Sequence, residues 1–70
     1  MATIKVLELV GVSDKSWHDA VDQALEEANK SVRNITGIDV LHTTAKVKDG
    51  RIQEYHANVK FAFRVENARA

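Results

Sequence analysis

The side chains that could do chemistry lie in the second half of the chain, and most of them are carboxylates. Asp39, Glu54 and Glu66 carry the oxygen ligands that calcium and magnesium prefer. The sequence has no Asp-x-Asp-x-Asp-Gly loop, so one chain offers no local cation site. A divalent-cation site would need carboxylates from several copies, and Asp49 is a weaker candidate because a turn uses it.

The histidines do not belong to a catalytic set. His42 and His56 are predicted to lie on opposite faces of one hairpin, so they do not chelate one metal within a chain. No motif brings a nucleophile, a base and an orienting group together in a pocket. We therefore do not expect an enzyme.

A chain of 70 residues is expected to be a single domain, residues 1–70. A core of this size seldom supplies more than about 3 to 5 kcal/mol, so small chains usually depend on disulfides, a metal or oligomerisation. There is no Cys, and the three His form no cluster with the spacing of metal ligands. Oligomerisation is the source of stability that remains.

Charge and hydropathy argue against two kinds of partner. Ten basic and ten acidic residues give a net charge of zero, so a basic face for nucleic acid is not expected. No apolar run approaches the roughly 18 residues of a membrane span, and the N-terminus does not resemble a signal peptide. Together with the absence of Cys, these features predict a cytoplasmic protein.

The first predicted element is a strand from Thr3 to Val10, ended by Gly11. It carries apolar side chains on both faces, which a strand open to solvent would not. A helix from Ser16 to Arg33 follows, capped by either Ser13 or Ser16. Its apolar stripe includes three alanines, which let the helix axis lie close to a sheet: Ala20, Ala24 and Ala28.

The rest of the chain predicts a long hairpin, Ile38 to Val47 and Arg51 to Val65, joined by an Asp49-Gly50 turn. Each arm reaches roughly 35 to 45 Å at about 3.3 Å per residue, whereas the helix spans about 27 Å. The hairpin therefore overhangs the helix, and its apolar residues need a cover from another copy. Residues 67–70 are expected to be a frayed tail.

The expected fold class is α+β, with the order β-α-β-β and a three-stranded antiparallel sheet wrapped on one helix. The third strand lies in the middle. A two-residue loop predicts that His42 pairs with Ala57 and Thr44 with Tyr55 on the helix-covered face. The other face is then predicted to pair Asp39 with Lys60, as a cross-strand ion pair, Leu41 with Asn58, and Thr43 with His56.

This pattern resembles the dodecins, small chains with a long curved hairpin wrapped on one helix. The resemblance covers residues 5–66 and rests on Lys5–Ser13, on the Ala-rich helix that begins near Ser16-Trp17, on Val32–Ile35 and on Val59–Glu66. It implies a hollow shell of twelve identical subunits. Trp17, on the apolar stripe, is expected in the core or at a subunit contact.

The resemblance also identifies candidate ligand-binding positions. Flavin-binding dodecins stack a Trp of strand two on the isoalloxazine ring and contact its edge with a Gln of strand three. Gly37 and His56 stand at these positions, Thr44 stands where some relatives have Arg, and only Arg64 matches. Because stacking is worth about 0.5 to 1.5 kcal/mol for an aromatic pair, FMN or riboflavin is expected to bind weakly, if at all.

Three functions stay open at this stage. The first is a shell that binds or sequesters a small ligand, with flavin as the family default. The second is a dodecin branch that lacks the stacking Trp and binds calcium or magnesium, held by Asp39, Glu54 and Glu66 of several copies. The third is a purely structural assembly.

Overall fold

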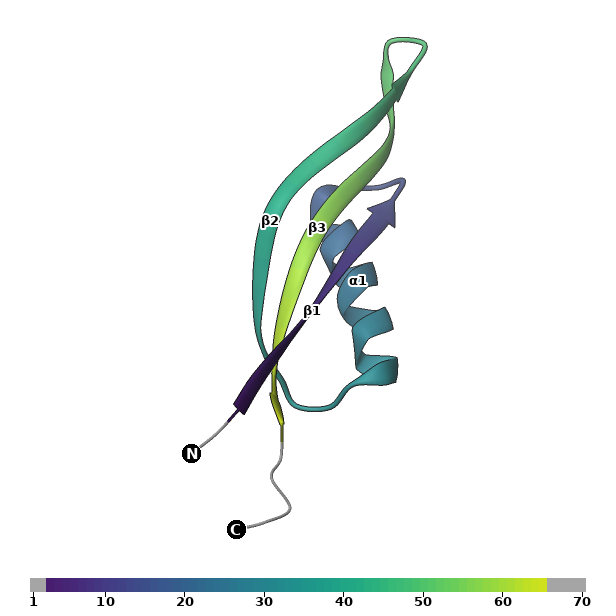
Figure 1. Ribbon diagram of the computed structural model, residues 1–70. Coiled ribbons are helices and arrows are strands. Elements are labelled where there is room, and N and C mark those ends of the chain that lie inside the picture. The colour runs from purple at the N-terminus through teal and green to yellow at the C-terminus, as the bar shows by residue number, and fades with distance from the viewer. Residues whose placement is uncertain (1–2, 66–70) are drawn as a thin grey trace.

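The computed structural model of the protein describes residues 3–65 (Figure 1). Its elements are β1 (Thr3–Ser13), α1 (Trp17–Ser31), β2 (Ile35–Lys48) and β3 (Arg51–Val65). The sheet order is β1-β3-β2, with β3 antiparallel to both neighbours. The predicted β-α-β-β order and the central place of the third strand are confirmed, while Glu66 and the predicted tail lie outside the described residues.

The first strand is longer than predicted, because Gly11 continues it instead of ending it. β1 runs to Ser13, and Gly11 is buried opposite Ala57. A Cβ added to Gly11 would lie 1.9 Å from the carbonyl oxygen of Ala20. At Gly11 the helix backbone therefore lies in close contact with the strand, and only a residue without a side chain fits there.

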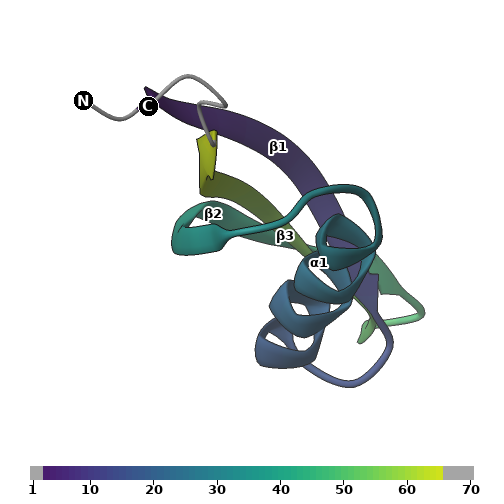
Figure 2. The ribbon, with the colours of Figure 1, turned by 90° about the horizontal axis from the view of Figure 1, so that it is seen from below.

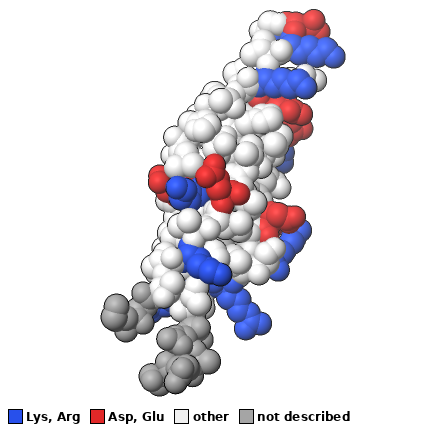
Figure 3. Space-filling model, in the orientation of Figure 1, with Lys and Arg blue, Asp and Glu red and all other residues white. Residues whose placement is uncertain are grey.

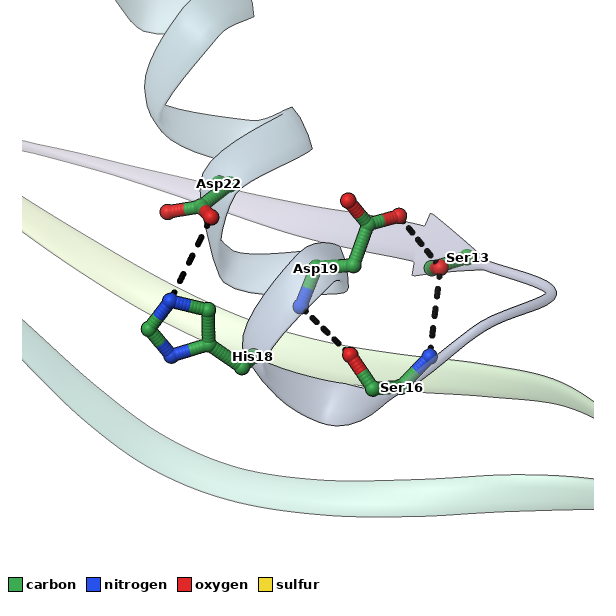
Figure 4. Close-up of polar contacts among 5 residues, drawn as sticks. All are labelled: Ser13, Ser16, His18, Asp19 and Asp22. Carbon is green, nitrogen blue, oxygen red and sulfur yellow. Dashed lines mark hydrogen bonds and ion pairs between the residues drawn. The ribbon is translucent and has the colours of Figure 1, made fainter.

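Two serines hold the start of α1 (Figure 4). Ser16 is the N-cap, and its Oγ accepts a hydrogen bond from the Asp19 backbone N–H at 2.9 Å. The Ser13 hydroxyl donates to the Asp19 carboxylate and accepts from the Lys15 backbone N–H at 2.9 Å. Both predicted caps are used, but the Asp19 carboxylate reaches Ser13 and not the Ser16 backbone.

The helix lies across one face of the sheet, as the view along the sheet shows (Figure 2). Its buried residues are the three predicted alanines, and they meet three side chains of β3. The buried core consists of Ala20, Ala24, Ala28, Ala57, Val59 and Phe61. Because four of these six are alanines, the helix packs closely but the chain buries little apolar volume on its own.

The helix ends two residues before the predicted Arg33. Val32 follows the last turn in extended conformation, and its N–H donates to the Ala28 carbonyl at 3.0 Å. Asn34 then adopts a positive φ of 63°, a conformation that Asn tolerates better than most residues. A three-residue link therefore returns the chain from α1 to β2.

The hairpin register is partly as predicted and partly shifted by β-bulges. Val40 lies opposite Val59 as expected, but Leu41 is an extra residue and His42 pairs with Asn58. Thr44 consequently pairs with His56, whereas Tyr55 was predicted. A bulge has no distinctive residue type here, so the regular two-residue alternation gave the wrong partners from His42 to Lys46. A second register shift after Lys46 restores the predicted pair of Val47 with Ile52.

The far end of the hairpin extends beyond the helix, as predicted (Figure 1). Val47 and Ile52 pair there and are 63% and 46% exposed. Asp49 and Gly50 form the turn with φ values of 54° and 74°, which suit a two-residue hairpin loop. The molecule is 57 Å long, whereas a helix of 15 residues spans about 22 Å.

Candidate functional site

The sheet has one face that the helix leaves uncovered. Ala57, Val59 and Phe61 of β3 are buried against α1. Side chains alternate along a strand, so the residues between and beyond them point to the other face. These residues are His56, Asn58, Lys60, Ala62 and Arg64.

The four ligand-side positions named by the resemblance all belong to this uncovered face. Thr44 pairs with His56, Gly37 pairs with Ala62, and Arg64 lies two residues further along β3. The two pairs are six residues apart on β3, which is about 20 Å along a strand. One chain therefore places these residues on one surface but does not gather them into one pocket.

Gly37 lies in a shallow hollow of about 300 Å³. Its floor is made of small and apolar side chains, Val6 and Ala62 among them, and Asp39 and Lys60 also line it. A Cβ added to Gly37 would lie 3.8 Å from the Ala62 Cβ, which is ordinary van der Waals contact. The glycine is not required by the backbone here, and the hollow has room for a larger side chain.

The Asp39–Lys60 pair is confirmed as a pair of opposite residues but not as an ion pair. The two residues face each other across the hairpin, as the two-residue loop predicted. Within residues 3–65, the ion pairs are made by other side chains, namely His18 with Asp22, Glu27 with Lys30, and Glu54 with His56. Both side chains at this edge of the hollow are therefore available to a ligand or to another chain.

His56 and Glu54, predicted for different sites, are in contact. His56 Nε2 lies 3.1 Å from Glu54 Oε1, and the His56 and Glu54 side chains are 31% and 41% exposed. The bulge at Leu41 also moves His42 to the face of His56, so the prediction that the two histidines lie on opposite faces is wrong. The signal that would have corrected it is the extra residue in β2, which the sequence alone does not reveal.

The carboxylates predicted to bind a cation are not brought together within one chain. Asp39 lies beside Lys60, and Glu54 contacts His56. Among residues 3–65, no group of three or more acidic or histidine side chains could hold a metal ion. Glu66 lies outside the described residues, so a cation site built from several copies stays a prediction.

Trp17 is not in the core but at the start of the helix, where it links α1 to the hairpin. Its side-chain Nε1–H donates to the Thr44 carbonyl oxygen at 2.8 Å. Its ring meets the Tyr55 ring edge-on, with centroids 4.8 Å apart. The residue is 39% exposed, so the prediction of a core position is wrong, and a subunit contact is still open.

The uncovered face of β1 is strongly apolar. Its exposed large side chains are Ile4 (53%), Val6 (60%), Val10 (52%) and Val12 (45%). Leu7 and Leu9, by contrast, pack against the core. The strand is thus apolar on both faces, as the sequence indicated, and only one face is covered by the chain itself.

These features define a class of small protein in which one helix covers one face of a long antiparallel hairpin. The sequence model of the dodecin family matches residues 3–66, so the chain belongs to the dodecin family. A dodecin of Thermus thermophilus is 29% identical over 62 residues, which cover 89% of this chain and 90% of that protein.

Solved structures agree with this membership. A dodecin from Streptomyces coelicolor superposes with a TM-score of 0.90 at 27% identity, covering 96% of both chains. A calcium dodecin from Mycobacterium tuberculosis, described as calcium-chelating with a novel calcium-binding site, has a TM-score of 0.80 at 26% identity, covering 97% of both chains. Within residues 3–65, α1 is too short and too polar to cross a membrane.

Proposed function

We propose that the protein assembles as a hollow homododecamer that binds or sequesters a small ligand, and that it is not an enzyme. The observation that carries this proposal is the apolar uncovered face of β1. Four large aliphatic side chains there are 45% to 60% exposed. Such a surface is stable in water when other chains cover it.

The proposed ligand-binding surface runs along the uncovered face of the hairpin, past Gly37, Thr44 and His56 to Arg64. Flavin is the default ligand by family, but the proposal here is weak binding. Gly37 offers no ring to stack on a flavin, and His56 is engaged with Glu54 at 3.1 Å. A cytoplasmic location is part of the same proposal.

The assembly is tested by measuring the molar mass in solution by light scattering at micromolar concentration. Twelve chains of 7.8 kDa give about 94 kDa. A monomer or dimer under these conditions would contradict the proposal. A riboflavin titration followed by flavin fluorescence then tests the ligand, and nanomolar affinity would contradict weak binding.

A divalent cation is the second candidate ligand, and a purely structural shell is the third. The likeness to the calcium-chelating relative favours the cation. In a symmetric shell, Asp39, Glu54 or Glu66 of several copies would meet at one point, where a cation would relieve their repulsion. If neither flavin nor a cation binds, the structural shell remains.

A further inference from the structure

The β-bulge in β2 brings two of the three histidines of the chain to one surface. His42 pairs with Asn58, and the next pair on the same face is Thr44 with His56. Ala57, between Asn58 and His56 on β3, is buried against α1, so this face is the one that the helix leaves uncovered. The two imidazoles are therefore diagonal neighbours across the hairpin.

Diagonal neighbours of this kind can share one metal ion. Such residues lie about 7 to 8 Å apart on an antiparallel pair, which is still within reach of aromatic and long side chains. Each imidazole carries its nitrogens well beyond its Cβ atom, and zinc binds such a nitrogen at about 2.0 to 2.1 Å. One ion between the rings of His42 and His56 would therefore contact both without a change in the register of the strands.

The ring of His56 is already held in the way that metal-binding histidines are held. Its Nε2 lies 3.1 Å from Glu54 Oε1. A metal-bound histidine almost always donates its second ring N–H to a carboxylate or a carbonyl, which fixes the orientation and the tautomer of the ring. When Nε2–H donates to Glu54, Nδ1 carries the free lone pair and is the nitrogen that a metal would bind.

The side chains directly beside the two histidines are uncharged. Asn58 and Thr44 are their cross-strand partners, and both carry a side-chain oxygen. On the β1 side, Val10 lies beside Asn58 and Val12 beside His56. In the view of Figure 3, where the sheet lies in front of the helix, a stretch of uncharged side chains separates the charges in the middle of the sheet from those nearer the hairpin tip. A cation would therefore meet no like charge in its immediate surroundings.

The nearest basic residues on this face lie one pair further along the hairpin in each direction. Lys46 is opposite Glu54, and Lys60 is opposite Asp39. Each lysine thus has a carboxylate across from it, so the pairs that flank the histidines add no net positive charge.

The ligand atoms select the class of metal. Imidazole nitrogens suit zinc, copper and nickel, whereas calcium and magnesium prefer oxygen. Within residues 3–65, no group of three or more histidine and acidic side chains could hold a metal ion, so two imidazoles are the protein ligands that one chain would supply. Water would complete the coordination of the ion.

We propose that His42 and His56 together bind a divalent transition-metal ion, zinc being the representative case, and that Glu54 positions the ring of His56. The inference goes beyond the proposed function, because both ligands belong to one chain and the site does not require the assembly. It also differs from the shared carboxylate site for calcium in its ligand atoms and in its metal.

Isothermal titration with zinc chloride, and with calcium chloride as the ion that prefers oxygen, tests the site. Zinc is expected to bind at least about tenfold more tightly than calcium, because both proposed ligands are nitrogens. Equal affinity for the two ions, or no binding of zinc, would overturn the proposal.

The three histidines provide matched variants for the same titration. His42→Asn and His56→Gln each remove one ligand and should weaken zinc binding by at least about tenfold. His18→Asn is the control, because the His18 side chain is 90% exposed on α1 and lies 3.4 Å from Asp22. It should leave the affinity for zinc unchanged. Equal losses in His18→Asn and His42→Asn would overturn the proposal, since zinc would then bind exposed histidines in general.

The role of Glu54 is tested by comparing two replacements. Glu54→Ala removes the acceptor for His56 and should weaken zinc binding by about tenfold. Glu54→Gln keeps an oxygen that can accept from Nε2–H and should retain most of the binding. Equal losses in both variants would contradict positioning of the ring by this hydrogen bond.

Light scattering of the same samples keeps this inference distinct from the proposed assembly. A protein with the mass of twelve chains that does not bind zinc rejects the histidine site and leaves the shell. Zinc binding by a monomer or dimer supports the site and rejects the shell.

Discussion

Trp17 donates its indole N–H to the backbone carbonyl of Thr44, 27 residues away, at 2.8 Å. The helix otherwise makes few contacts with β2 and packs mainly on β1 and β3. This one hydrogen bond therefore connects the start of the helix to β2, the outer arm of the hairpin, while the edge-on contact to Tyr55 connects it to β3.

Replacing this indole tests the link. Trp17→Phe keeps an aromatic ring beside Tyr55 but removes the donor, so we expect a loss of about 0.5 to 1.5 kcal/mol in stability. Trp17→Ala should lose the ring contact too, about 0.5 to 1.5 kcal/mol more. Thermal melting at one fixed protein concentration measures both, and an unchanged midpoint for Trp17→Phe would mean that water replaces the hydrogen bond without loss.

Two glycines give a matched test of packing. In Gly11→Ala the new Cβ would meet the Ala20 carbonyl oxygen, so the helix must move away from the strand. We expect destabilisation of at least about 1 to 3 kcal/mol, as for an overpacked core. Gly37→Ala, with only an ordinary contact to Ala62, should stay within about 0.5 kcal/mol of the parent. Equal melting points for the two variants would contradict the close approach at Gly11.

A charge on the uncovered face of β1 should separate folding from assembly. Val10 is 52% exposed, so Val10→Glu should leave the fold of a single chain intact. In an assembly that buries this face, the unpaired charge would cost several kcal/mol, and the mass by light scattering should fall. Gln23→Glu, at an exposed position of α1, is the control with the same charge change. An unchanged mass for Val10→Glu would place the subunit contacts elsewhere.

Restoring the family's flavin contacts should raise flavin affinity. Gly37→Trp together with His56→Gln supplies the stacking ring and the side-chain amide, and the hollow at Gly37 has room for the ring. Stacking alone is worth about 0.5 to 1.5 kcal/mol for each aromatic contact. Quenching of riboflavin fluorescence measures the change, with each single variant as a control. If affinity does not rise, the pocket differs in shape and not only in these two contacts.

Calcium should stabilise the protein if copies share a cation through their carboxylates. A ligand that binds only the assembled form stabilises it by about 2.7 kcal/mol when its concentration is about a hundred times Kd. The melting temperature therefore rises with the calcium concentration. Melting with calcium, with magnesium and with a chelator measures this, and Glu54→Gln tests one of the three candidate ligands. An unchanged melting temperature at millimolar calcium, together with no ordered ion in crystals grown in calcium, would contradict a cation shared between copies.

The sequence was sufficient to predict the fold because each element has a strong local signal. The alanine stripe of the helix, the Asp49-Gly50 turn and the position of β3 between its neighbours are all found as predicted. Gly11 was misread because a glycine at a strand end and a glycine under a helix look alike in sequence. Only the position of Ala20 in space distinguishes them.

The candidate site was harder to predict than the fold. Four ligand-side positions were named through the resemblance, and they do share one face of the sheet. Their cross-strand partners were wrong where the bulge intervenes, so the pairing of Thr44 with His56 was missed.

The bulge at Leu41 has a consequence for comparing this chain with its relatives. Val40 pairs with Val59 and His42 with Asn58, so Leu41 is the one residue between them without a partner on β3. Deleting it would leave both neighbouring pairs in place and every later side chain on its present face. A relative that is one residue shorter in this strand should therefore be aligned with its gap at Leu41, and not at the turn.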